Sequence, residues 1–414
     1  MTGQQELAQQ SSPEAGRLEL FDDVDDIEDY PDGGGEAWTV VFGAWCAMIP
    51  SMGLLNTVGV LQAWVWTHQL RDYTEFDIGW IFGLYGFFLY VTGAQVGPIF
   101  DAHDVRLTIV PSEYYQFLLT FGVLGGLSAS CQFTPAIATI GHWFSKRRAL
   151  ATGIACTAGG TGGIIFPLII LYAAPVIGYG WAIRIVGFIC LIAGVLACWL
   201  LRKRLPHNKK AGASIDLKAL KDRNYALTTL AVWLVEFAVF IPYTYISSYA
   251  IYQGVEPQHA YRLSALLNAG AIPGRALPGY VADRFGYFNV MCITSFTCAT
   301  FIFALWLTSG ASEAAITAFA VIFGFWSGAA ISLTPVCIGQ VCKTEDYGKR
   351  SGTTFSISSL AVLVSIPIAG AIVNASGGAF TGLIVFAGAS YMAAFLAFLL
   401  TRIVAAGWSW RIQF

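Results

Sequence analysis

The sequence predicts an all-α protein that crosses a membrane many times and consists of two related halves. Of its 414 residues, 56% are hydrophobic and 12% are charged, whereas a soluble domain carries about 25% charged residues. Apolar runs of about 20 residues recur along the chain, each long enough to cross a bilayer as a helix. Two landmark prolines, Pro135 and Pro167, recur 200 residues later as Pro335 and Pro367, which indicates an internal repeat.

Eleven membrane helices follow from these apolar runs, because only helices satisfy their own backbone hydrogen bonds in lipid. A basic linker at 203–224 separates five helices in a first half, 37–202, from six in a second half, 225–404, which is followed by a short cytoplasmic tail, 405–414. The predicted helices span 38–66, 76–100, 114–141, 149–177, 181–202, 225–250, 261–282, 288–309, 314–341, 351–374 and 379–404.

The spacing of the repeat predicts that the third helix of the first half is missing. A Gly-x-x-x-Asp sequence ends an apolar helix in each half, at Gly97–Asp101 and at Gly279–Asp283. The repeated proline follows the aspartate after 34 residues in the first half (135 − 101) and after 52 in the second (335 − 283). The shortfall of 18 residues corresponds to about 27 Å of helix, close to one membrane crossing. Residues 102–113 are therefore predicted to form a short connection.

Basic residues define the orientation of the chain. From residue 146 onward, pairs of predicted helices separate the clusters of Lys and Arg, which lie at 146–148, 202–223, 284, 343–350 and 402–411. The positive-inside rule places all of them on the cytoplasmic side.

The N-terminal segment 1–36 is acidic, with eleven acidic residues and one base, Arg17. It has too little apolar content to fold, so we predict a disordered acidic cytoplasmic tail. Because the basic cluster at 146–148 is also cytoplasmic, a cytoplasmic tail requires an even number of membrane crossings between the tail and residue 146. Only three helices are predicted in that segment. The chain as it stands would then place the tail outside or reverse the helix at 114–141, and we expect it to transport poorly.

The residues give no indication of an enzyme or a cofactor. The nine cysteines and five histidines are scattered, and no Cys-x-x-Cys, phosphate-binding loop or nucleophile triad is present. We therefore predict no enzymatic activity, no metal, no cofactor and no nucleic-acid partner.

Several local motifs accompany the basic central linker: DGGGEAW at 32–38, HWFSKRRALATG at 142–153, AGGTGG at 158–163, GRALPG at 274–279 and ADRFG at 282–286. With these motifs the chain resembles, over about residues 31–414, the major facilitator superfamily and within it the fungal monocarboxylate-porter-like (monocarboxylate transporter) family. The resemblance implies a fold of two six-helix halves and alternating access to a small-molecule site, here with about 11 helices. It also implies that Asp101, Asp283, Arg284 and the Lys146–Arg147–Arg148 cluster latch the halves together in cytoplasmic loops.

The sequence departs from this family at two positions. Where proton-linked lactate carriers place a lysine in the first helix, this chain has Asn56, and where they place an aspartate in the eighth helix it has Ala271. Their arginine is kept as Arg275. The resemblance thus argues against classical proton–lactate symport and for transport, including export, of an organic anion or secondary metabolite. Proton-coupled monocarboxylate symport is one alternative, and a transport-incompetent sensor or truncated gene product is another.

Two ionisable residues are predicted at mid-membrane depth, Glu236 and Arg275. A charge at that depth is costly and normally faces a cavity. We predict that both side chains face a central cavity and approach each other as a substrate or proton site. The alternatives are a structural pairing of the arginine and a neutral glutamic acid in helix packing.

Weaker candidates lie nearer the outer side. Arg184 follows Gly180-Trp181 and is either a substrate contact or a snorkelling side chain, and Tyr243 lines either a cavity or an interfacial aromatic belt. Asn374 begins a glycosylation sequon, Asn374-Ala-Ser376. We expect a monomer in the plasma membrane, with the vacuolar or another internal membrane as the alternative, and a small-molecule substrate with protons as the candidate coupling ion.

Overall fold

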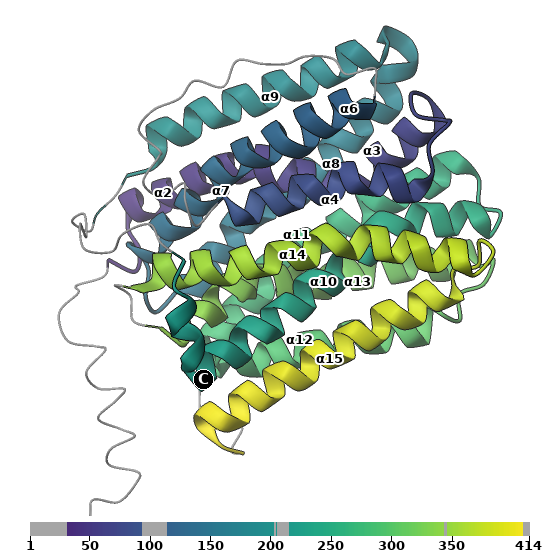
Figure 1. Ribbon diagram of the computed structural model, residues 1–414. Helices are drawn as coiled ribbons and strands as arrows, with labels where there is room; N and C mark the ends of the chain where they lie inside the picture. The colour runs from purple at the N-terminus through teal and green to yellow at the C-terminus, as the bar shows by residue number, and fades with distance from the viewer. Residues whose placement is uncertain (1–30, 93–113, 203, 205–214, 343–345, 409–414) are drawn as a thin grey trace, which may run out of the picture.

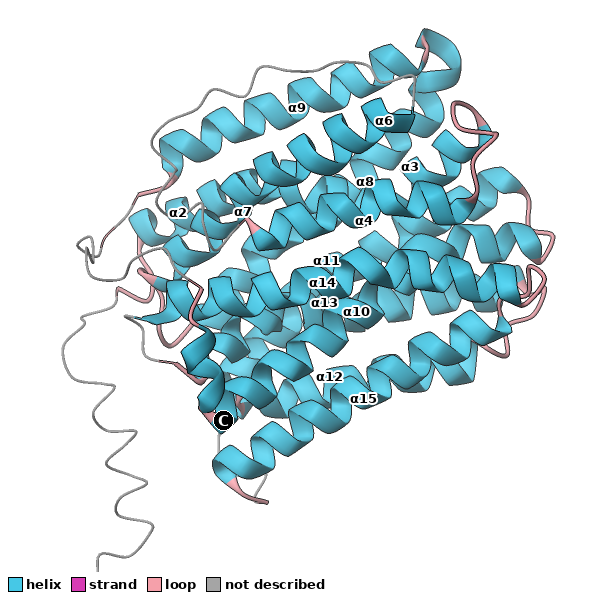
Figure 2. Ribbon diagram, viewed as in Figure 1, coloured by secondary structure: helices cyan, strands magenta, loops and turns pink. Residues whose placement is uncertain are grey.

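The computed structural model describes residues 31–92, 114–202, 204, 215–342 and 346–408, and over these residues it consists of helices and loops (Figure 2). The helices form two bundles packed side by side, one from each half of the chain, with the first-half helices above the second-half helices in Figure 1. The all-α prediction is confirmed.

The first half of the chain forms five helical rods among its described residues. Pro50 lacks the amide hydrogen that an α-helix needs, and the first rod contains a π-helical turn at that point. Thr74 and Asp77 form a capping box at the start of the second rod, which satisfies free amides there. The elements are α2 (Gly35–Met48), η1 (Ile49–Gly53) and α3 (Leu54–Thr67), then α4 (Glu75–Val91), then α6 (Tyr114–Phe117), η2 (Leu118–Gly125) and α7 (Gly126–Gly141), then α8 (Arg148–Ile177) and α9 (Tyr179–Leu200).

The second half forms six rods after a short 3₁₀ turn, η3 (Leu217–Lys221). Gly286, at φ 93°, provides the left-handed backbone that turns the second of these rods into the third. The elements are α10 (Arg223–Tyr252), α11 (Pro257–Phe285), α12 (Tyr287–Phe301) with η4 (Ile302–Trp306), α13 (Glu313–Gln340), α14 (Tyr347–Ala375) and α15 (Thr381–Ala406).

Nine helices of the described residues are long and apolar enough to cross a membrane. The other two rods are α4, of which 17 residues are described, and α11, whose polar residues include Asn268 and Arg275. The protein is therefore a multi-pass membrane protein. The total of eleven helices stays a prediction, because residues 93–113 lie outside the described residues.

The rods α4 and α6–α7 run in the same direction. Tyr114 at the start of α6 donates a hydrogen bond to the carbonyl of Asp77 at the start of α4, at 3.0 Å. Farther along, the rings of Tyr90 and Phe133 lie 6.0 Å apart. Consecutive membrane helices joined by a short loop run antiparallel, so this shared direction is what an intervening helix would produce. In the second half, α12 follows α11 and packs against α13 and α15.

Without its third helix, the chain was expected to have its tail on the outer side or a reversed helix at 114–141. The described residues show neither. Asp32 accepts hydrogen bonds from the backbone amides of Ser145 and Arg147, at 2.8 and 3.3 Å, so the start of α2 lies on the side of the basic loop. The helix at 114–141 is not reversed. The predicted short connection at 102–113 and Asp101 lie outside the described residues.

The first half buries less of its helices than the second. The apolar segment of α9 is 17% buried and that of α6–α7 is 33% buried, whereas their second-half counterparts, α15 and α13, are 44% and 50% buried. In the second half α12 covers both counterparts. Among the described residues of the first half, no helix packs on α9 and α6–α7 as α12 packs on their counterparts.

Candidate functional site

Arg275 lies on α11 at the interface between the two halves and is fully buried. Its Nη1 donates to the carbonyl of Cys156 on α8, at 2.5 Å. Its Nε and Nη2 have no hydrogen-bond partner among the described residues. A side chain on Gly159 would collide with Nη1, so the glycine makes room for the guanidinium. A buried guanidinium with two unused donors is suited to bind an anion.

Glu236 lies on α10 and is also buried. Its Oε2 accepts a hydrogen bond from the hydroxyl of Tyr90 on α4, at 3.2 Å. Because α4 belongs to the first half and α10 to the second, this bond joins the two halves. A carboxyl group in such a place can bind or release a proton while the halves move.

Glu236 and Arg275 line the same space, of about 290 Å³, which we call the central cavity. It lies between the halves, and its other lining residues are Met52, Tyr90, Phe133, Ile137, Cys156, Ile331 and Phe355. The ion pairs found among the described residues do not include this pair. Glu236 and Arg275 therefore line one cavity without forming an ion pair, and their role in transport stays a prediction.

Asn56 and Tyr243 lie beside Arg275. The side-chain amide nitrogen of Asn56 would be 3.2 Å from a Cβ on Gly159 and has no hydrogen-bond partner among the described residues. Tyr243 is buried and interacts electrostatically with Arg275. Neither residue is among those described as lining the central cavity, so their role in the substrate pathway stays a prediction.

Ala271, which replaces the family's aspartate, packs against α13. Its Cβ would be 3.2 Å from a Cβ on Gly328, and Ala271 is fully buried. The close approach of α11 and α13 leaves little room for a carboxylate at this position. The carboxyl group of the central cavity comes from Glu236 on α10 instead.

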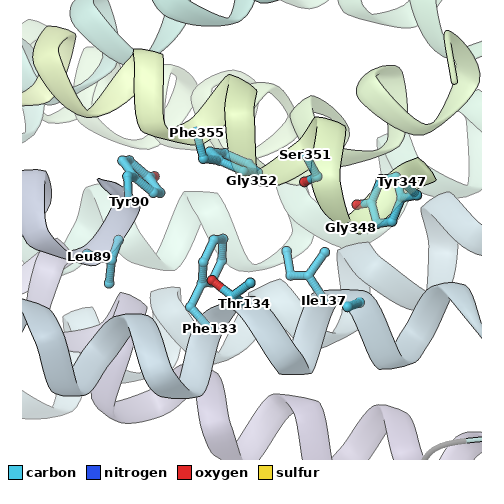
Figure 3. Close-up of a pocket in the computed structure, with 11 residues that line it drawn as sticks. Leu89, Tyr90, Phe133, Thr134, Ile137, Tyr347, Gly348, Ser351, Gly352 and Phe355 are labelled. Carbon is cyan, nitrogen blue, oxygen red and sulfur yellow. The ribbon is translucent and has the colours of Figure 1, made fainter. Parts of the chain in front are cut away.

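A second space, of about 390 Å³, adjoins the central cavity on the cytoplasmic side of Glu236 and Arg275. We call it the cytoplasmic pocket. It lies between α4 and α7 of the first half and the N-terminal turns of α14 (Figure 3). Four residues line both spaces: Tyr90, Phe133, Ile137 and Phe355. The other lining residues are Leu89, Thr134, Ala138, Tyr347, Gly348, Ser351 and Gly352.

Asp283 connects the halves at their cytoplasmic ends. Its two carboxylate oxygens accept hydrogen bonds from the backbone amides of Ala149 and Leu150, both at 3.0 Å. These amides open α8, and a carboxylate is favourable at a helix N-terminus because free amides and the helix dipole both attract it. Arg148 adds a contact across the interface, because its guanidinium lies 4.1 Å from the ring centre of Tyr347 on α14.

The other predicted gating residues do not bridge the halves in the described structure. Lys146 and Arg147 are exposed, and the Arg284 guanidinium stacks on Tyr280 of its own helix, at 4.3 Å. Of the predicted gating residues, Asp283 and Arg148 therefore contact the other half. Their role as a latch stays a prediction, and Asp101 lies outside the described residues.

Replacing Asp283 by alanine should weaken the cytoplasmic contact between the halves. The change removes both hydrogen bonds to α8, and loss of a helix cap costs about 0.5–2 kcal/mol. We expect a cysteine placed at Leu150, in a chain without its native cysteines, to react several-fold faster with a maleimide. Asp346→Ala is the matched control, since Asp346 precedes α14 without a side-chain cap. Equal labelling of both variants and the parent would contradict the latch.

Two predicted residues lie away from the central cavity. Arg184 is exposed on α9, with its guanidinium 4.9 Å from the Trp181 ring centre, which favours the snorkelling alternative. Asn374 is exposed near the end of α14.

Sequence reasoning missed Tyr90, Phe133 and Phe355, because nothing in a uniformly apolar helix marks the face that meets another helix.

Residues 40–365 match the family described as Major Facilitator Superfamily. The chain belongs to the major facilitator superfamily. It is 34% identical to the aspyridones efflux protein apdF of Emericella nidulans, over 85% of this chain and 74% of that protein. It is 32% identical to the riboflavin transporter MCH5 of Saccharomyces cerevisiae, over 94% of this chain and 82% of that protein.

A solved structure has the same fold. A variant of the E. coli fucose:proton symporter FucP superposes with a TM-score of 0.53 and 15% identity, covering 88% of this chain and 97% of that chain. Members of the superfamily are membrane transporters for small molecules and are not enzymes.

Proposed function

We propose that this major facilitator superfamily transporter exports an organic anion, of the kind made as a secondary metabolite, by alternating access. The observation that carries the proposal is Arg275, which is buried between the halves with two unused donors and opens into the central cavity. An anionic group bound there would satisfy those donors and neutralise a charge that is costly inside a membrane.

The position of the cytoplasmic pocket supports loading from the cytoplasm. The halves touch backbone to backbone on both sides of the central cavity. On the outer side a Cβ on Gly83 of α4 would lie 2.8 Å from the Leu363 carbonyl of α14, and on the cytoplasmic side a Cβ on Gly279 of α11 would lie 2.6 Å from the Ala149 carbonyl of α8. The larger, cytoplasmic pocket lies on the cytoplasmic side of the central cavity, at the N-terminal end of α14. A relative that is named an efflux protein is consistent with this direction.

Glu236 is the proposed site of proton coupling. When it is ionised it accepts the hydrogen bond from Tyr90 and holds α4 to α10. When it is protonated that bond weakens, because a neutral acceptor attracts a phenol less strongly. A proton can then move in one direction while the anion moves in the other. Proton-coupled monocarboxylate symport would use the same two groups and is the alternative, with the opposite direction for the anion.

A change of Glu236 to glutamine tests this coupling. In proteoliposomes holding a transport-competent form, we expect a pH gradient to accelerate anion transport in the parent. Glu236→Gln cannot exchange a proton, so it should lose this acceleration and retain anion exchange without a gradient. The exposed Glu256, changed to Gln, is the control. A mutant that responds to the gradient as the parent does would place the coupling elsewhere.

The same chain is also a candidate for a transport-incompetent sensor or a truncated gene product. The observation that favours this is that no described helix packs on α6–α7 and α9 as α12 packs on α13 and α15.

An exporter of this kind would act in the plasma membrane, and as a vacuolar protein it would instead sequester its substrate. We propose a monomer in either membrane.

A further inference from the structure

The wall between the central cavity and the cytoplasmic pocket is an aromatic cluster. The rings of Tyr90 and Phe355 stack with their centres 5.2 Å apart and an interplanar angle of 21°. Phe133 meets Phe355 edge to face at 5.9 Å. Because α4 and α7 belong to the first half and α14 to the second, the cluster spans the interface (Figure 3). It separates the space that holds Glu236 and Arg275 from the space near the cytoplasm.

The two spaces differ in chemistry. The central cavity contains both ionisable side chains. The described residues that line the cytoplasmic pocket include no charged side chain; their polar groups are the hydroxyls of Thr134, Ser351 and the two tyrosines. A ligand that fills both spaces must have an acidic end and an apolar body.

We propose that the substrate is an amphipathic organic acid that binds head first. Its acidic group would contact Arg275, and its apolar body, a flat ring system or an aryl-alkyl chain, would lie between Phe133 and Phe355. The body would point toward the cytoplasm. This inference rests on the proposed anion site at Arg275 and adds that short acids such as lactate are poor ligands, because they leave the cytoplasmic pocket empty.

Tyr90 belongs to both parts of this site. Its ring stacks on Phe355, where the body would lie, and its hydroxyl bonds to Glu236. A body inserted between the rings must displace the stacked arrangement and with it the phenol. A substrate that occupies the cytoplasmic pocket would therefore disturb the hydrogen bond between Tyr90 and Glu236, the proposed proton site. A short acid, which leaves the pocket empty, would not.

Binding to the purified full-length chain in detergent tests the proposal. The probes are acetate, benzoate, 2-naphthoate and 2-naphthamide, and the readout is the concentration of each that gives half of the maximal thermal stabilisation. We expect 2-naphthoate to bind at least about tenfold more tightly than acetate, because more apolar area leaves water. The neutral amide should bind much more weakly than the acid. Equal affinities of acetate and 2-naphthoate, or of the acid and its amide, would overturn the proposal.

Variants locate the apolar body. Ala138→Phe fills the cytoplasmic pocket, and we expect it to bring the ratio of the acetate and 2-naphthoate constants close to one. Phe355→Ala removes one of the rings that would contact the apolar body, so it should also lower the ratio of the acetate and 2-naphthoate constants. Because the two variants act on different residues, the test remains possible if one of them does not fold. Leu124→Phe, at an exposed position on η2, should leave the ratio unchanged. A ratio that none of the pocket variants alters would place the body elsewhere.

The controls separate this inference from the anion site itself. If no acid binds, the proposed function at Arg275 fails and the inference fails with it. A second outcome is that acids bind, that Arg275→Ala abolishes their binding, and that acetate and 2-naphthoate have equal constants. The anion site would then stand, and the amphipathic substrate would be refuted.

Discussion

Changing Arg275 to alanine should abolish binding and transport of organic anions and leave membrane insertion intact. The guanidinium is the one buried cation among the described residues that line the central cavity. Removing one partner of a buried charge pair costs about 2–5 kcal/mol, so affinity should fall at least about thirtyfold. Thermal stabilisation by 2-naphthoate in detergent is one measurement, and anion flux in proteoliposomes that hold a transport-competent form is the other.

Two further variants sharpen this result. Arg275→Lys keeps the charge but loses the planar fork that binds an acid through two hydrogen bonds, so it should restore binding in part. Arg262→Ala changes an exposed arginine of the same helix and should bind as the parent does. If Arg275→Ala transports at the parent rate, the arginine is a structural residue held by the Cys156 carbonyl, and the proposed anion site is wrong.

A restored third helix should convert a chain that transports poorly into one that transports. We expect activity close to background for the present chain and robust flux for a form carrying about 18–30 residues after Asp101, the length of one crossing. The physical reason is that α6–α7 and α9 pack on no described helix that corresponds to α12. The transcript around codons 101–112 is the place to look for an omitted exon.

The measurement compares both forms in an export assay, with a protease-accessible tag on the N-terminus. The tag should be protected from outside in the restored form. A form with an added helix of the same length after Gly377, in an exposed turn between α14 and α15, controls for insertion as such. Equal flux from the present chain and the restored form would show that the shorter first half is functional, and the truncated-product alternative would then be excluded.

Much of the site could be predicted from sequence because it depends on depth in the membrane. Glu236 and Arg275 stand out as ionisable residues in long apolar helices, and a charge there must face protein or a cavity. Asp283 stands out because the Gly-x-x-x-Asp sequence in which it lies recurs in the other half. The same reasoning did not separate Arg184 from the true cavity residues, because an arginine near a helix end has the lipid surface as an equally good environment.

The aromatic wall could not be predicted, for a reason that applies to most of the interface. Tyr90 and Glu236 are 146 residues apart, and each lies in a helix that is apolar on every side. In a soluble helix the polar face identifies the buried one, but in lipid both faces are apolar, so periodicity does not distinguish a lipid contact from a helix contact. Glycine positions carry more information, since a helix approaches closely where a Cβ is absent, yet they do not name the partner.

The sequence by itself determined the class of the protein, the repeat and the superfamily, because these follow from composition, length and local motifs. The tertiary structure alone decided that Glu236 bonds to Tyr90, that Arg275 is held by a carbonyl on α8, and that an apolar pocket continues the charged cavity toward the cytoplasm. Those features depend on which faces of distant helices meet. That choice is made by the packing of whole helices, where small residues permit contact and bulky ones prevent it.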